Sequence, residues 1–138
     1  EKRILQEFVE INQRLFVLNE SETDIEKLFN EKKMIMGCYA FIHDCLIGFK
    51  IGFEQEPHIF ESWRGGVIEE FREQGIGTHL MELQHQWCKI KNFWKVVTVT
   101  NADNTAMISL NSRHGFKVIQ HTTNRGNIQK VHFQKDLQ

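Results

Sequence analysis

The segment VIEEFREQGIGT, residues 67–78, decides how the chain folds, because it joins two kinds of secondary structure through a turn with two glycines. The apolar run that ends at Val67 and Ile68 has the character of a strand, whereas Gly77 to Lys91 has helical periodicity. The first N–H groups of a helix have no partner inside it, and glycine lets a bulky anion approach them closely. The junction therefore predicts a phosphate-binding turn.

Length and composition are those of one ordinary globular domain over residues 1–138. Apolar residues make up 41% of the chain and charged residues 25%, and the formal net charge is -1. This balance gives no basic field for nucleic acid, and no apolar run approaches the ~20 residues that span a bilayer. The sequence begins at Glu1 without a methionine, so the expectation leaves room for a first strand upstream of residue 1.

The three cysteines, Cys38, Cys45 and Cys88, are odd in number and lack the spacing of a disulfide framework. Free cysteines are typical of a reducing compartment, so we expect a cytoplasmic protein. His43 and Cys45 are two residues apart, but no second pair has ligand spacing. The sequence therefore predicts no metal site.

Before the turn, the pattern predicts two helices followed by three strands. The predicted elements are helices over 2–18 and 21–33 (the second capped by Ser21 or Thr23), strands over 34–42 and 46–53 that form a hairpin, a loop over 54–58, and a strand over 59–68. Gly65 and Gly66 interrupt the last strand, and glycines inside a strand predict a bulge.

After the turn, helices alternate with strands. The predicted elements are a helix over 77–91 that packs through Leu80, Leu83, Trp87 and Ile90, a strand over 93–100, a helix over 105–113 capped by Asp103 or Asn104 and closed by Gly115, and strands over 116–121 and 129–137 around a loop over 122–127. A strand, helix and strand in this order form a right-handed crossover with a parallel pair. The sequence therefore predicts an α/β fold with a mixed sheet.

Two common phosphate binders do not fit the turn. A P-loop ends in Gly-Lys-Ser/Thr, which the chain lacks. A dinucleotide fingerprint needs a third glycine where this chain has Leu80, and an acidic ribose partner in the region that reads Lys95-Val96-Val97. Neither class of nucleotide site is expected here.

What fits is Arg72-x-x-Gly75-x-Gly77 at the junction of a strand and a helix, which resembles the signature of the GNAT superfamily of N-acetyltransferases. The resemblance covers roughly residues 34–135. It includes a downstream series that has the expected order and spacing: Asn104, Ala106, Leu110, Gly115 and Phe116. It implies a mostly antiparallel sheet with a splayed parallel pair, flanked by helices.

The resemblance also implies acetyl-coenzyme A as co-substrate, with a set of residues around it. The N–H groups of the turn would hold the pyrophosphate, the end of the strand would face the thioester, and Asn104 would bind the pantetheine arm. The implied cofactor-binding residues are Val67, Ile68, Arg72, Glu73, Gln74, Gly75, Ile76, Gly77, Thr78 and Asn104.

Transfer of an acetyl group needs an unprotonated amine, and an amine with a pKa near 10.4 needs a general base at neutral pH. Glu61 is the best candidate, because it lies on the central strand eleven residues before Arg72, near the offset of the catalytic glutamate in histone-type members. Strand alternation places Glu61, Trp63 and Gly65 on one face. His58 is the second candidate.

The general acid stays open. Many members of the superfamily have a tyrosine four residues before the glycine of Gly115-Phe116, and this chain has Asn111 there. The only tyrosine is Tyr39, in an earlier strand. Asn111 is a candidate catalytic residue that can donate a hydrogen bond to sulfur but cannot give up a proton.

Two functions from different classes follow. The first is an N-acetyltransferase that moves an acetyl group directly to a primary amine of a small molecule or peptide. The alternative is a non-catalytic coenzyme A-binding sensor or interaction domain. Asn111 slightly favours this alternative, whereas Glu61 and the intact phosphate turn favour the enzyme. The sequence does not identify the acceptor. Homodimers are common in the superfamily, and a homodimer remains open here.

Overall fold

The computed structural model describes residue 10 and residues 22–138. The helix predicted over 2–18 lies outside the described residues except for Glu10, which is helical, and the predicted cap Ser21 also lies outside them.

Within residues 22–138, six strands form one sheet in the order β1-β2-β3-β4-β6-β5. Only the central pair, β3 and β4, is parallel, and the four other neighbouring pairs are antiparallel. The mixed, mostly antiparallel sheet predicted from the sequence is therefore confirmed. The strands are β1 (Lys33–Ile42), β2 (Cys45–Glu56), β3 (Ile59–Val67), β4 (Lys95–Asn101), β5 (Lys117–Thr123) and β6 (Gln129–Asp136).

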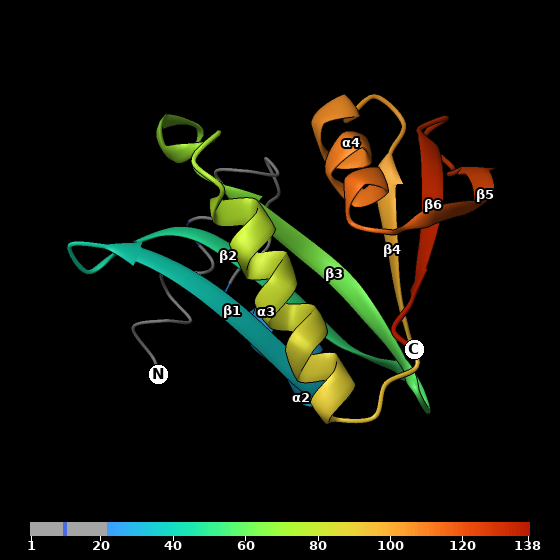
Figure 1. The fold of residues 1–138 in the computed structure, drawn as a ribbon, viewed down its shortest axis with the longest axis horizontal. Helices are drawn as coiled ribbons and strands as arrows, with labels where there is room; N and C mark the ends of the chain where they lie inside the picture. The colour runs from blue at the N-terminus through green and yellow to red at the C-terminus, as the bar shows by residue number, and fades with distance from the viewer. Residues whose placement is uncertain (1–9, 11–21) are drawn as a thin grey trace.

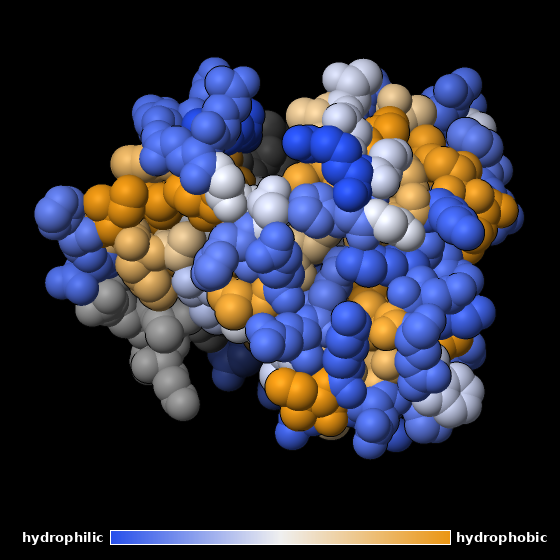
Figure 2. Space-filling model, in the orientation of Figure 1, coloured by the Kyte–Doolittle hydropathy of each residue, from blue (hydrophilic) through white to orange (hydrophobic). Residues whose placement is uncertain are grey.

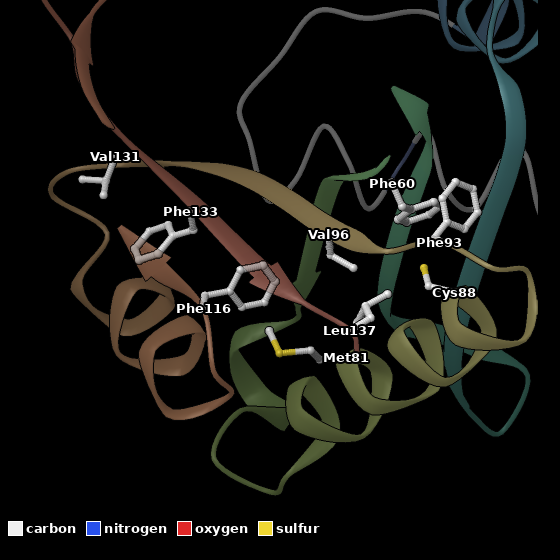
Figure 3. Packing of buried hydrophobic residues seen from close by; sticks show 9 residues of the cluster. All are labelled: Phe60, Met81, Cys88, Phe93, Val96, Phe116, Val131, Phe133 and Leu137. Atoms are coloured by element: carbon white, nitrogen blue, oxygen red, sulfur yellow. The ribbon is translucent and has the colours of Figure 1, made fainter. Parts of the chain in front are cut away.

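Helices cover both faces of this sheet (Figure 1). They are α2 (Glu22–Glu31), the short 3-10 helix η1 (Glu69–Phe71), α3 (Ile76–Ile90) and α4 (Thr105–Arg113). On one face, Met81 and Cys88 of α3 pack with Phe60 and Val96 of the sheet, as Figure 3 shows. On the other, Ile25 of α2 joins a second cluster with Leu46, Phe49, Ile51 and Ile68.

The predicted loop over 54–58 is wrong in its length. β2 continues to Glu56, and only Pro57 and His58 form the turn to β3. Glu54 pairs with Phe60, and Glu56 pairs with Ile59. Polar side chains at the exposed end of a hairpin resemble a loop in sequence, although their backbone belongs to the ladder.

The predicted bulge at Gly65 and Gly66 is also wrong. These glycines pair in regular register with Lys50 and Phe49. The extra residue of β3 is Trp63, because Arg64 pairs with Ile51 whereas Ser62 pairs with Gly52. Gly65 is closely approached by its neighbour in β2, since a Cβ there would lie 3.2 Å from Cγ of Lys50.

The predicted apolar face of α3 is partly wrong. Leu80 is buried, but Leu83 is 42% and Ile90 is 71% exposed. The buried side of the helix consists of Leu80, Met81, Gln84, His85 and Cys88. Because two residues on that side, Gln84 and His85, are polar, the spacing of apolar residues did not identify it as the buried side. Hydrophilic residues cover much of the surface over α3, with separate apolar areas between them (Figure 2).

The remaining elements lie close to their predicted positions. α2 ends at Glu31 instead of residue 33, and Thr23 lies inside it instead of capping it. α4 spans the predicted residues, with Asn104 as its cap and Gly115, at a φ of 88°, following its end. β5 extends to Thr123, which shortens the loop predicted over 122–127. No helix among residues 22–138 is long and apolar enough to cross a membrane.

Candidate active site

The parallel strands β3 and β4 separate part of the way along their length. Their pairing covers only Ile59 with Lys95, Phe60 with Val96, and Glu61 with Val97. Beyond these residues β3 stays with β2 up to Val67, and β4 stays with β6 up to Asn101. Figure 1 shows the two strands diverging toward α4. The result is a V-shaped opening in the centre of the sheet.

The vertex of the V has a local cause. Thr98 Oγ1 donates a hydrogen bond to the carbonyl oxygen of Ser62 at 2.9 Å, just after the last paired residues. The extra residue Trp63 follows at once, and a bulge bends its strand and increases its twist. The bulge therefore turns β3 away from β4 at the point where their ladder ends.

The edge of β3 inside the V offers backbone groups to a ligand. Ile68 N–H donates to the carbonyl oxygen of Ile47 in β2 at 2.8 Å. Alternate residues of an antiparallel strand point to opposite sides in the plane of the sheet. Val67 and Gly65 therefore turn their N–H groups toward the V, whereas the N–H of Ile68 is occupied by the sheet.

The predicted phosphate turn lies at the open end of the V. Glu73 has a φ of 64° and Gly75 a φ of 81°, and Gly75 is the N-cap of α3. No side chain of the described residues caps this helix, and the first intrahelical bond runs from His79 N–H to Gly75 at 3.0 Å. A Cβ on Gly75 would meet nothing within 4 Å. The first turn of α3 therefore presents N–H groups next to open space, as an anion requires.

The second arm of the V carries α4 over β4. Asn104 Oδ1 accepts a hydrogen bond from Met107 N–H at 3.2 Å, so the side-chain oxygen caps the helix and the amide N–H groups point elsewhere. Thr78 Oγ1 lies 3.5 Å from His114 Nε2, which connects the start of α3 to the end of α4. The residues predicted to bind pyrophosphate and pantetheine thus flank one opening.

The two predicted catalytic residues lie on different faces of the sheet. Glu61 is the last β3 residue in the parallel ladder, and Gln55 Nε2 donates to its Oε1 at 3.2 Å. Because Phe60 packs on the α3 side, Glu61 points to the α2 side, where Trp63 packs. Asn111 is 1% exposed on the α3 side, and its Nδ2 donates to Thr100 Oγ1 at 3.4 Å.

His58, the second candidate base, lies at the hairpin turn. Its Nδ1 is 3.2 Å from the carbonyl oxygen of Asn92, and its ring stacks on Trp94 with centroids 3.9 Å apart. Glu61 is three positions further along the chain, about 10 Å away along β3. The structure places His58 away from the phosphate turn, at the other end of the strand.

One buried residue in the strand next to β3 was not predicted from the sequence. Lys50 lies in the middle of β2 and is 8% exposed. Its burial lowers the pKa of the ammonium group to about 8, and Cys38 opposes this effect. The available signal was a lysine inside the apolar run from Leu46 to Phe53.

Comparisons with known proteins agree with this geometry. The sequence model of the acetyltransferase (GNAT) family matches residues 5–116. A comparison with curated proteins by sequence finds no match.

Several solved structures share the fold at low sequence identity. A ribosomal-protein-S18-alanine N-acetyltransferase from Escherichia coli has a TM-score of 0.86 and 18% identity, over 99% of this chain and 90% of that one. An aminoglycoside 6'-N-acetyltransferase complexed with coenzyme A has a TM-score of 0.84 and 13% identity, over 100% and 93%. The PaiA N-acetyltransferase from Thermoplasma acidophilum, in complex with coenzyme A, has a TM-score of 0.67 and 21% identity, over 84% and 71%.

Proposed function

Because the chain belongs to the acetyltransferase (GNAT) family, we propose that it transfers an acetyl group from acetyl-coenzyme A directly to a primary amine of a small molecule or peptide. The proposal rests on one observation above the others: the opening between β3 and β4 ends at the uncapped N-terminus of α3. We also propose that residues 1–138 act as a single domain in the cytoplasm.

The cofactor would lie along the V. The N–H groups between Arg72 and Thr78 would hold the pyrophosphate, and each charge-assisted hydrogen bond of this kind contributes roughly 1.5–3 kcal/mol. The pantetheine arm would pair with the edge of β3, where the N–H groups of Gly65 and Val67 face it. One of these N–H groups would stabilise the negative charge that develops on the thioester oxygen. Two of the neighbouring structures contain coenzyme A, which supports this placement.

The acceptor would be activated by Glu61. Deprotonation of an ammonium group with a pKa near 10.4 costs about 4–5 kcal/mol at neutral pH. A carboxylate that takes this proton, directly or through water, leaves the nitrogen lone pair free to attack the acetyl carbon. Glu61 lies at the vertex, where the two strands separate.

The cysteines argue for direct transfer without an acyl-enzyme. Burial raises the pKa of the Cys88 thiol to about 12 and also raises that of Cys38. A thiol needs to ionise to act as a nucleophile. Cys45 is exposed at the start of β2, in the hairpin that joins β1 to β2.

The neighbours act on acceptors as different as a ribosomal protein and an aminoglycoside, so the acceptor class has to be measured. Thiol release from acetyl-coenzyme A should be followed with polyamines, amino acids, aminoglycosides and a lysine peptide. Release with one class establishes the transferase and names its acceptor. Coenzyme A binding by calorimetry without release from any amine favours the sensor. Absence of coenzyme A binding refutes the site.

A further inference from the structure

We propose that Lys50 is the general acid that protonates the departing sulfur of coenzyme A. This inference rests on the proposed acetyl transfer and assigns a step for which the family's tyrosine is missing. Asn111 occupies that position, and its amide donates to Thr100. An amide does not release a proton near neutral pH, so another group has to supply it.

Lys50 lies on the face of the sheet that carries α3 and α4. Its neighbours in β2, Phe49 and Ile51, belong to the cluster around Ile25 of α2. Successive side chains of a strand point to opposite faces, so Lys50 points to the α3 side. Asn111 lies on this same side, over the other arm of the V.

The stem of Lys50 contacts β3 at a glycine. Lys50 pairs with Cys38 in β1 on one side and with Gly65 in β3 on the other. A Cβ built on Gly65 would lie only 3.2 Å from Cγ of Lys50, so the lysine stem occupies the space that a β3 side chain would fill. Gly65 lies beyond the last parallel pair, where β3 borders the opening. The stem up to Cγ therefore lies against Gly65 of β3, the strand that borders the opening.

α3 closes this space from above. Ile76 packs over Gly48, with 3.5 Å between its Cγ2 and a Cβ built on the glycine. Helix α3 and strand β2 run in the same direction, because both are antiparallel to β3. Lys50 comes two residues after Gly48, which is about 6.6 Å along the strand. Leu80 comes four residues after Ile76, which is about 6 Å along the helix. Lys50 therefore lies under the turn that contains Leu80, and Gln84 and His85 follow one turn later.

Gln84 and His85 place polar atoms without a hydrogen-bond partner in this interior, among the described residues. Both polar atoms of the Gln84 amide, and Nε2 of His85, are buried without a hydrogen-bond partner among the described residues. Buried polar atoms are ordinarily paired with protein or water. Water held by these groups would connect Lys50 to the proton pool.

The charge state of Lys50 suits a proton donor to sulfur. Its pKa of about 8 lies near the ordinary thiol value of about 8.5, so transfer between the two is almost balanced. Two titratable groups face it from neighbouring elements, and both are neutral at pH 7. Burial raises the pKa of Cys38, and it lowers the pKa of His85 to about 3.

The step balances as follows. The amine nitrogen bonds to the acetyl carbon, the carbon–sulfur bond breaks, and its electron pair goes to sulfur. Lys50 gives a proton from Nζ to that sulfur and becomes neutral. The acceptor ammonium loses two protons overall, and one of them, passed through Glu61 and water, restores Lys50. The other enters solvent.

The test compares Lys50→Met, which removes the proton, with Lys50→Arg, which keeps the charge but does not act as an acid in this pH range. We expect kcat of both variants to fall about 100-fold at pH 7. Coenzyme A affinity should change less than threefold. Wild-type kcat should decline above pH ~8, and Lys50→Arg should lack that decline. Lys91→Met, a change of the exposed lysine after α3, should match the wild type.

Each outcome separates the two proposals. An active wild type with an equally active Lys50→Met variant overturns the role of Lys50 alone. A Lys50→Arg variant with wild-type kcat and the same decline above pH 8 also overturns it, since charge would then suffice. A wild type that binds no coenzyme A, or releases no thiol with any amine, refutes the proposed function instead. Circular dichroism and coenzyme A binding show whether a slow variant is folded.

Discussion

Arg72 Nε donates a hydrogen bond to the carbonyl oxygen of Val67 at 2.8 Å. This bond joins the end of β3 to the turn that leads into α3. It therefore holds the N–H of Val67, which faces the opening between β3 and β4, in a fixed position relative to the N–H groups at the start of α3. In the proposed function, Arg72 would position this backbone.

Replacing Arg72 should weaken cofactor binding. Arg72→Gln removes both the charge and the bond from Nε, and the loss of one hydrogen bond corresponds to about 1 kcal/mol, or roughly fivefold in Kd for coenzyme A. Arg72→Lys keeps the charge and should lose almost as much if positioning dominates. Arg113→Gln is the matched control, because Arg113 Nε donates to Ser109 inside α4. Calorimetry that finds Arg72→Lys equal to the wild type would contradict the positioning role.

Gly75 offers a test of the anion site in which strain and charge are separated. Asn and Asp have nearly the same shape, and both tolerate the left-handed conformation that Gly75 adopts at a φ of 81°. Gly75→Asn should bind coenzyme A less tightly than the wild type. Gly75→Asp should bind it at least tenfold less tightly again, because its carboxylate would face the pyrophosphate. Equal affinities of the two variants would show that no anion binds at this turn.

Glu61→Gln should lower kcat at neutral pH by about 100-fold and leave coenzyme A affinity within a factor of two. The physical reason is that an amide does not accept the proton of the acceptor amine. The loss should shrink as the pH approaches the pKa of that amine. Glu56→Gln, at the exposed end of the same hairpin, is the control. An unaltered pH–rate profile in Glu61→Gln would remove Glu61 as the base.

The sequence was most informative where backbone conformation decides the structure. Gly75 and Gly115 have positive φ, and Asn104 caps α4. Each of these conformations can be predicted from the residue type and the adjacent sequence alone. The position of the bulge at Trp63 carries no such local signal, and the lysine inside the apolar run from Leu46 to Phe53 does not tell what Lys50 faces. Both depend on which residue lies opposite in the next strand, and pairing between strands is set by the whole sheet.

Stability measurements can test which face of α3 is buried. Met81 is 1% exposed and packs in the main core, whereas Leu83 is 42% exposed. Met81→Ala should lower the free energy of unfolding by about 2–5 kcal/mol, since it leaves a cavity. Leu83→Ala should cost about 0.5 kcal/mol or less. Urea unfolding that ranks the two variants in the opposite order would support the face predicted from the apolar residues alone.

The buried imidazole of His85 should make stability depend on pH. Burial, with the neighbouring Lys135 and other cations, lowers the pKa of His85 to about 3 from an ordinary value of 6.5. His85 of the unfolded chain therefore binds a proton below pH ~6.5, whereas His85 of the folded chain binds it only below pH ~3. Stability is complete above pH ~6.5 and falls with pH in this window by up to about 1.4 kcal/mol per unit.

From pH 7 to pH 5 this single group should remove about 2 kcal/mol from the free energy of unfolding. His85→Gln does not titrate, so its loss over the same interval should be smaller than that of the wild type by about this amount. Because the other groups titrate alike in both proteins, the comparison isolates His85. Equal losses in the wild type and His85→Gln would mean that the folded protein accepts a proton on this imidazole and that the interior beneath α3 is wetter than its burial indicates.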